Sequence, residues 1–459
     1  MTLNSISKYL IISSLCFPAH SFAEMVQDAN ATLPLQQSPE TNATVPFISK
    51  NKVSLKTAVN EAIDTNYRVK QAKERVEQSQ HFIREAYADF LPQVALTGNT
   101  QRKKYEGFDN QNYSQSQYNF VVSYNLFSSG KDFATVQKNK ILKQQQEEKL
   151  KGTLEEEIVK IIDAYFSVVY GKLSLDVNQK NYDKLVKIYE IVKTKRELGA
   201  ATMGDESSIS ASVSNAKTAM TNTESAYNNA KDYYEFLTNK KVEEYVPYET
   251  GFEINLPSID EVLEGIQANN TDVNIIKSQI KAKQKEIFIN KATDYPTIDL
   301  TFTDSRRNRY DYDNHNALPP ADGYNTDQLV QLSFNYNLYT GGRTEAKTAR
   351  LMSEATEGAY NLEYTSKELK WNSQKLYNSV QTNTKTLETL SSEIEASEKM
   401  ADAYWERFRL SSQDLVTLLQ AQRQVNSAEL EKLRSEKTRI LDYFNLLAKQ
   451  GKLLEYFGY

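Results

Sequence analysis

The stretches VVSYNLFSSGK, residues 121–131, and LSFNYNLYTGGR, residues 332–343, decide the fold of this chain. Each ends a run that alternates polar and apolar residues, which is the period of a β-strand. Each also opens a very long segment rich in Ala, Glu, Lys and Leu. A strand that leads into a long helix, twice in one chain, predicts an internal duplication.

The duplication extends well beyond these two stretches. Residues from Leu55 to Leu96 match residues 204 positions later, and residues from Gly130 onward match residues 212 positions later. We therefore expect two halves with one plan, namely helix, β-hairpin, long helix, turn and helix. The first half spans residues 54–240 with its hairpin at 91–127. The second spans 258–448 with its hairpin at 295–339.

The remaining segments lie outside the two halves. Residues 1–23 have one early charge, an apolar run and a small-x-small cleavage site, which predicts a secretory signal peptide. We expect an extended segment at 24–53, a linker at 241–257 and a C-terminal tail at 449–459. Cys16 follows Leu15 in the apolar run, so it is a poor lipidation site. It is the one cysteine, so no disulfide is expected.

Charge and hydropathy limit the partners of the chain and the way in which it could cross a membrane. A net charge of −5 with mixed signs argues against nucleic acid as a partner. No later run of about 18 apolar residues exists, which leaves a closed β-barrel as the route across a membrane. Alternating strands also suit a soluble sheet with one wet face. The signal peptide and the tyrosines that flank the strands favour the barrel.

The segments after the hairpins predict unusually long helices. Residues 131–198 and 343–410 can be helical throughout, at roughly 100 Å each. Leu154, Ile161 and Val168 recur at intervals of seven, which predicts coiled-coil packing. A soluble coiled-coil rod would explain this period but not the strands.

The shorter helices match the long ones in summed length. Predicted helices at 54–89 and 205–240 together nearly equal the helix at 131–198, so they can stack end to end beside it. The helices at 258–293 and 412–448 repeat this in the second half.

Four strands cannot close a barrel, so several chains must pool theirs, giving eight strands from two chains or twelve from three.

Other chemistries find little support in the sequence. The loop Asp311 to Asn316 hints at calcium but lacks the glycine and the closing glutamate of such a site, so we expect no metal. Beyond the predicted signal peptide there are two histidines, and there is no phosphate-binding glycine loop or HExxH motif. We therefore expect neither an enzyme nor a cofactor.

The chain resembles the TolC family of bacterial outer-membrane efflux and type I secretion proteins over about residues 54–450. The strand-to-helix junctions NLFSSGK (125–131) and NLYTGGR (337–343) resemble the family's P-L-F-x-G-G-x pattern, with asparagine in place of proline. Gly130, Gly341 and Gly342 would let the chain turn there. The segment at 407–422 resembles the family's helical tip motif, with residues 198–208 as its first-half counterpart.

The resemblance implies a mixed α and β membrane protein that forms a homotrimer. Its β-barrel of twelve strands would lie in the outer membrane, in contact with lipid, and its α-barrel would cross the periplasm. The expected partners are a periplasmic adaptor protein and an inner-membrane pump, either an ABC transporter or a proton-driven one.

The resemblance also places the pore entrance at the helical tips. Asp205 holds the position of a family carboxylate, and Glu206 lies next to it. In the second half the two family aspartates correspond to Thr417 and Gln420, while Asp414 lies one turn earlier. Gln413 stands where some members carry a gating arginine, and Phe408 replaces a tyrosine.

The sequence favours an outer-membrane exit duct for type I protein secretion. The poor lipidation site and the near absence of a C-terminal extension lean that way. The alternative is a small-molecule channel of the same family for drugs or metal ions. A structural coiled-coil surface protein is a more remote alternative.

Overall fold

The computed structural model describes residues 55–103, 113–240, 254–311, 323–410 and 414–459. The predicted signal peptide, the extended segment, residues 241–253 of the linker, the loop from 312 to 322 and Gln413 lie outside the described residues. The first half comprises α2 (Leu55–Thr65), α3 (Tyr67–Ala88), β1 (Gln93–Lys103), β2 (Tyr113–Phe127), α4 (Lys131–Glu197) and α5 (Met203–Thr238). The second comprises α6 (Ile259–Asn269), α7 (Thr271–Lys291), η2 (Ala292–Asp294), β3 (Thr297–Asp311), β4 (Gly323–Asn335), α8 (Arg343–Arg409) and α9 (Leu415–Lys449), and α10 (Leu453–Phe457) follows it.

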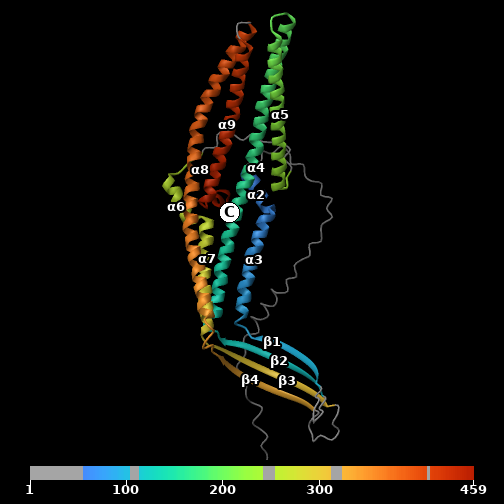
Figure 1. Ribbon diagram of the computed structural model, residues 1–459, viewed down its shortest axis with the longest axis vertical. Helices are drawn as coiled ribbons and strands as arrows, with labels where there is room; N and C mark the ends of the chain where they lie inside the picture. The colour runs from blue at the N-terminus through green and yellow to red at the C-terminus, as the bar shows by residue number, and fades with distance from the viewer. Residues whose placement is uncertain (1–54, 104–112, 241–253, 312–322, 411–413) are drawn as a thin grey trace, which may run out of the picture. The chain divides into compact units, whose positions relative to one another are not determined.

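The predicted fold class is confirmed in its main features. Long helices and four strands form two repeated halves, and the four strands make one antiparallel sheet in the order β1-β2-β3-β4 (Figure 1). α4 and α8 end within one residue of the predicted helices. β4 ends at Asn335, although the alternation of polar and apolar residues continues to Leu338.

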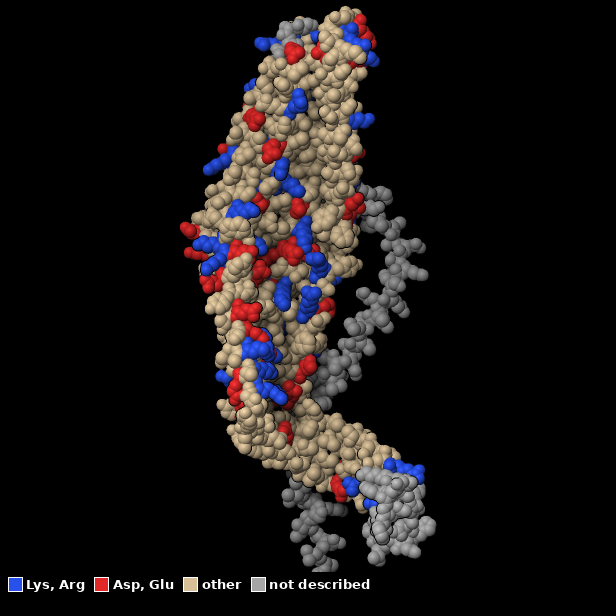
Figure 2. Space-filling model, viewed as in Figure 1, with Lys and Arg blue, Asp and Glu red and all other residues tan. Residues whose placement is uncertain are grey.

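The register of the sheet separates an apolar face from a polar one. Val94, Val122, Phe302 and Val330 stand opposite one another across the four strands. The row three residues along, Thr97, Asn119, Ser305 and Asp327, belongs to the other face. Asn119 bridges this polar row, because its Nδ2 lies 3.4 Å from Thr97 Oγ1 and its Oδ1 accepts from Ser305 Oγ at 2.9 Å. In Figure 2, charged side chains of both signs gather over the helices, whereas most of the sheet is uncharged.

The helices form four columns, which we number across the chain (Figure 1). The first is α3 followed by α5, the second α4, the third α7 followed by α9, and the fourth α8. Contacts run from α4 to α3 and α5 on one side and to α7 and α9 on the other, and both α7 and α9 contact α8. Two shorter helices thus share the length of each long one, as the predicted lengths implied.

The predicted helices at 54–89 and 258–293 are each divided in two. Asn66 ends α2 and caps α3, because its Oδ1 accepts from the backbone N–H groups of Arg68 and Val69. Asn270 does the same between α6 and α7. Asparagine competes with the helix for backbone hydrogen bonds, which is why it favours such breaks.

The main core lies where α2, α4, α5, α9 and α10 meet. Phe166, Phe444 and Phe457 are fully buried there. Phe457 belongs to α10, so the residues predicted as a C-terminal tail are part of the core rather than an appendage. No helix within the described ranges combines the length and apolar character needed to cross a membrane.

Candidate functional site: the helical tips

The first tip is a tight reversal between α4 and α5. Gly199 adopts a left-handed conformation with φ of 76°, and its N–H bonds to the Arg196 carbonyl at 2.9 Å. A side chain there would be strained, which explains the glycine. Thr202 then caps α5.

The Asp205 side chain takes part in that cap. Its Oδ2 accepts from the backbone N–H of Thr202 at 2.9 Å and from the Thr202 hydroxyl at 2.8 Å. The Asp205 N–H donates in return to Thr202 Oγ1 at 3.1 Å. This reciprocal pair is a capping box, which stabilises the start of a helix. Asp205 therefore has a structural role, and a role in the pore stays a prediction.

Glu206 joins the two helices of the first tip. Its carboxylate forms an ion pair with Arg196, the penultimate residue of α4. The hydrogen bond that the Arg196 guanidinium donates to Glu206 raises the pKa of Arg196. The charge on Glu206 is thus partly balanced within the tip.

The candidate residues of the second tip differ in their surroundings. Asp414 caps α9, because its Oδ2 accepts from the Val416 N–H at 3.2 Å. Thr417 is half-buried and Gln420 is exposed. Both are neutral, so Asp414 is the acidic candidate of the second tip among the residues described.

Phe408 lies in a small core that joins the two tips. It is buried with Leu185 and Val192 of α4, Ile209 of α5 and Leu418 of α9. Its contacts come from both helical hairpins, so the tips pack together rather than standing apart. We expected Phe408 near the pore, and the structure gives it a packing role.

Lys195 is a tip residue that sequence reasoning missed. Its ammonium group donates to the Phe408 carbonyl at 2.7 Å and lies 4.4 Å from the centre of the Phe408 ring. That carbonyl is at the C-terminal end of α8, where the helix dipole attracts a cation. The two residues are more than 200 positions apart, so no local pattern in the sequence could pair them.

The junction glycines lie between strand and helix in both halves. Gly130 and Gly342 cap α4 and α8 with φ of 77° and 76°. Ser129 and Gly341 precede them with φ of 55° and 69°, so each junction has two left-handed residues in succession. The Ser129 hydroxyl bonds to the Pro296 carbonyl at 2.6 Å, which ties the first junction to the second half.

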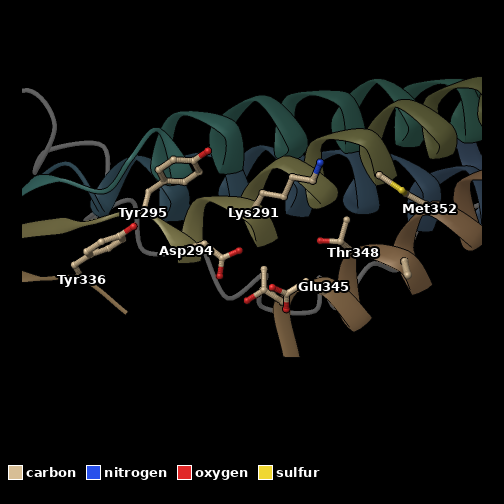
Figure 3. Close-up of a pocket in the computed structure, with 9 residues that line it drawn as sticks. Lys291, Asp294, Tyr295, Tyr336, Glu345, Thr348 and Met352 are labelled. Carbon is tan, nitrogen blue, oxygen red and sulfur yellow. The ribbon is translucent and has the colours of Figure 1, made fainter. Parts of the chain in front are cut away.

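A pocket of about 580 Å³ lies beside the second junction. Lys291, Asp294 and Tyr295 line it from one side, and Tyr336, Glu345 and Thr348 from the other (Figure 3). The described residues contain no group of His, Cys, Asp or Glu placed to hold a metal ion. The loop from Asp311 to Asn316, for which we expected no metal, lies mostly outside those residues.

Residues 58–233 and 262–449 match the family described as outer membrane efflux protein, and the chain belongs to this family, the TolC family. Proteins of this family are channels rather than enzymes. The chain is accordingly an exit channel of the outer membrane that extends into the periplasm. No protein of curated function matches it.

Several solved structures share the fold at low sequence identity. CusC is similar with a TM-score of 0.75 at 13% identity, covering 87% of this chain and 92% of that one. The Campylobacter jejuni outer membrane channel CmeC has a TM-score of 0.74 at 14% identity, covering 87% and 86%. The open state of the Neisseria gonorrhoeae outer membrane channel MtrE has 0.71 at 18%, covering 87% and 90%.

Proposed function

We propose that this chain is the outer-membrane duct of a tripartite system that exports small molecules. The family description carries the proposal, because it names efflux as the activity. The leaning of the sequence toward type I protein secretion rested on the lipidation site and on the C-terminal residues. The C-terminal residues pack in the core through α10, and this packing does not distinguish one substrate from another. Protein secretion remains the second candidate.

The proposed assembly is a homotrimer with a periplasmic adaptor and an inner-membrane transporter. Four strands per chain are too few to close a membrane barrel, which starts at about eight. Channels of this family work as trimers in tripartite systems, and three chains would supply twelve strands. The two-sided character of the sheet suits such a barrel, with the apolar face toward lipid and the polar face toward the lumen.

Deleting the gene tests the choice of substrate. Small-molecule efflux predicts that the deletion strain becomes several-fold more susceptible to a panel of toxic dyes, detergents and metal ions. Its profile of secreted proteins should stay unchanged. Loss of one secreted protein with unchanged susceptibility would instead support type I secretion. Re-expression of the intact chain controls for effects on neighbouring genes.

We further propose that Asp205, together with Glu206 and Asp414, contributes negative charge at the pore entrance. Asp205→Asn keeps an oxygen that can accept the capping bonds of Thr202 and removes the charge. The cation preference of the channel in planar bilayers should fall, whereas Asp232→Asn, an exposed site on the same helix, should leave it unchanged. An unchanged preference in Asp205→Asn would assign this residue to capping alone.

A further inference from the structure

The positive charge of the sheet is confined to the end that carries the hairpin loops. Within the described strands, the lysine and arginine residues all belong to β1 and β3, namely Arg102, Lys103, Arg306, Arg307 and Arg309. Figure 2 shows blue side chains at this end of the sheet, away from the helices. A surface with one sign of charge concentrates ions of the opposite sign.

Arg307 and Arg309 lie on the polar face of the sheet. Ser305 belongs to that face, where its hydroxyl bonds to Asn119, and the side chains of a strand alternate between the two faces. Arg307 and Arg309 therefore follow Ser305 on the polar face, about 7 Å apart along the strand. Arg306 lies between them in the sequence and belongs to the other face. Two neighbouring guanidinium groups thus share the polar face.

Neutral amides flank Arg307 on this face. Its register partners are Gln117 of β2 and Asn325 of β4. The Gln117 Oε1 lies 3.4 Å from the Gln115 Nε2, and the Gln117 Nε2 donates to Asn119 Oδ1 at 2.8 Å. The amides of β2 are thus bonded to one another along the strand. They do not balance the charge of a guanidinium group.

The charge of Arg307 is not paired within the part of the chain that the structure describes. There Arg307 forms no ion pair, and its buried Nε makes no hydrogen bond. Asp327, an exposed acid opposite Ser305, lies diagonally from Arg307 on the polar face. Arg306 differs, because its guanidinium nitrogen lies 3.8 Å from Asp304 Oδ2 on the other face. Arg307 is therefore available to a negatively charged ligand.

We propose that Arg307 and Arg309 bind oxyanions at the loop end of the lumen, so that solutes with a carboxylate or phosphate group are held there as they leave. The site rests on the proposed function, because that function turns the polar face toward the lumen, and it names anionic solutes as the substrate class. A guanidinium group binds such an oxyanion through two parallel hydrogen bonds. Two guanidinium groups repel each other, and a bound anion reduces that repulsion.

The oxyanion site is separate from the acids proposed at the pore entrance. Those acids lie at the helical tips, and the sheet lies at the opposite end of α4 and α8 (Figure 1). The proposed duct would then have acids at one end and arginines at the other. Each end can be tested by adding ions to its own side of the membrane.

Block of single channels by tripolyphosphate tests the site in the intact protein. The long helices stay on the side from which protein is added to a planar bilayer, so the hairpin loops open to the opposite chamber. Tripolyphosphate in that chamber should block the current at a lower concentration than in the chamber of the helices. Arg307→Gln removes the charge and keeps a polar side chain. The loss of one charge-assisted hydrogen bond should raise the half-blocking concentration by about tenfold.

Arg306→Gln is the matched control for this experiment. It removes the same charge from the preceding residue of β3, but on the opposite face of the sheet. It should leave the half-blocking concentration unchanged. If Arg307→Gln forms no channels, Arg309→Gln takes its place and is compared with the same control.

The outcomes separate the oxyanion site from the duct itself. Relief of the block in Arg307→Gln and not in Arg306→Gln supports the site. Absence of block from the loop side in the intact protein overturns it, and so does a block that both variants or neither variant relieves. Intact protein that inserts into the bilayer and carries no current overturns the proposed function, and the site falls with it.

Discussion

Glu155 is a buried acid whose charge opposes the fold. It is 6% exposed on α4, and the Thr271 hydroxyl lies 3.4 Å from its Oε2. Burial raises the pKa of Glu155 from 4.5 to about 7, although the Thr271 hydroxyl and Lys449 act in the other direction. Asp272 and Glu148 add repulsion to the raising effect of burial. The protonated form is therefore the one that suits the site.

This pKa shift predicts a loss of stability as pH rises. A raised folded-state pKa contributes stability that is present below pH 4.5 and lost as pH rises through 7. The free energy of unfolding is expected to fall by about 3 kcal/mol between these two pH values because of this one group. Glu155→Gln mimics the protonated form, so it should raise the melting temperature at pH 8 and change it little at pH 5. Thermal unfolding in detergent at both pH values measures this.

Glu156 supplies the control for that experiment. It is the next residue on α4 and is exposed, and its hydrogen bond with Lys160 lowers the pKa of the Glu156 carboxyl. Its charge favours the fold, so Glu156→Gln should not stabilise the protein at pH 8. Equal stabilisation by both variants would point to a general reduction of negative charge, and the account of Glu155 would then be wrong.

At the scale of elements, the two helix breaks share one design but differ in their partners. Asn66 and Asn270 each cap a helix through Oδ1. Asn66 Nδ2 donates to Glu157, a carboxylate that is 2% exposed, at 2.9 Å. Asn270 Nδ2 donates to the neutral Lys449 carbonyl at 3.0 Å. Hydrogen bonds to charged groups are the stronger ones.

We predict that Asn66→Ala destabilises the protein more than Asn270→Ala does. Loss of either cap costs about 1 kcal/mol. The lost bond to Glu157 adds roughly 1.5–3 kcal/mol, and the lost bond to a neutral carbonyl adds about 1 kcal/mol. Chemical denaturation of both variants compares the two free energies of unfolding. A larger loss in Asn270→Ala would mean that Lys160 and Arg68 already satisfy Glu157.

The sequence predicted elements better than it predicted their breaks and partners. The bounds of α4 and α8 followed from heptads and from the glycines at their starts, which are local signals. The breaks at Asn66 and Asn270 were missed, because apolar periodicity continues through them and only the side-chain bonds reveal the cap. At the tips, the place of the first reversal, within residues 198–208, followed from the resemblance to the family. The burial of Phe408 and its contact with Lys195 depend on packing between the halves.

At the scale of the whole molecule, Lys195 adds a hydrogen bond between the two hairpins to the apolar cluster around Phe408. The first tip has its own ion pair between Arg196 and Glu206, within one hairpin. Lys195 instead spans from α4 to the end of α8. In the proposed duct, opening the entrance requires the hairpins to move, and this link would oppose such movement if the hairpins separate.

We predict that Lys195→Met increases the fraction of time that the channel is open. The variant keeps the length of the side chain and removes the donor to the Phe408 carbonyl. That bond contributes roughly 1–3 kcal/mol. Because 1.4 kcal/mol is a factor of ten, the open-to-closed ratio should rise by about fivefold to 150-fold. Single-channel recording in planar bilayers measures the ratio directly.

Lys193→Met is the matched control, since Lys193 is exposed two residues earlier on the same helix and its loss removes the same charge. An equal rise in both variants would attribute the effect to charge at the entrance rather than to the link. No rise in Lys195→Met would mean that the apolar cluster around Phe408 holds the hairpins without it. A rise confined to Lys195→Met would show that the hydrogen bond between Lys195 and the end of α8 stabilises the closed channel.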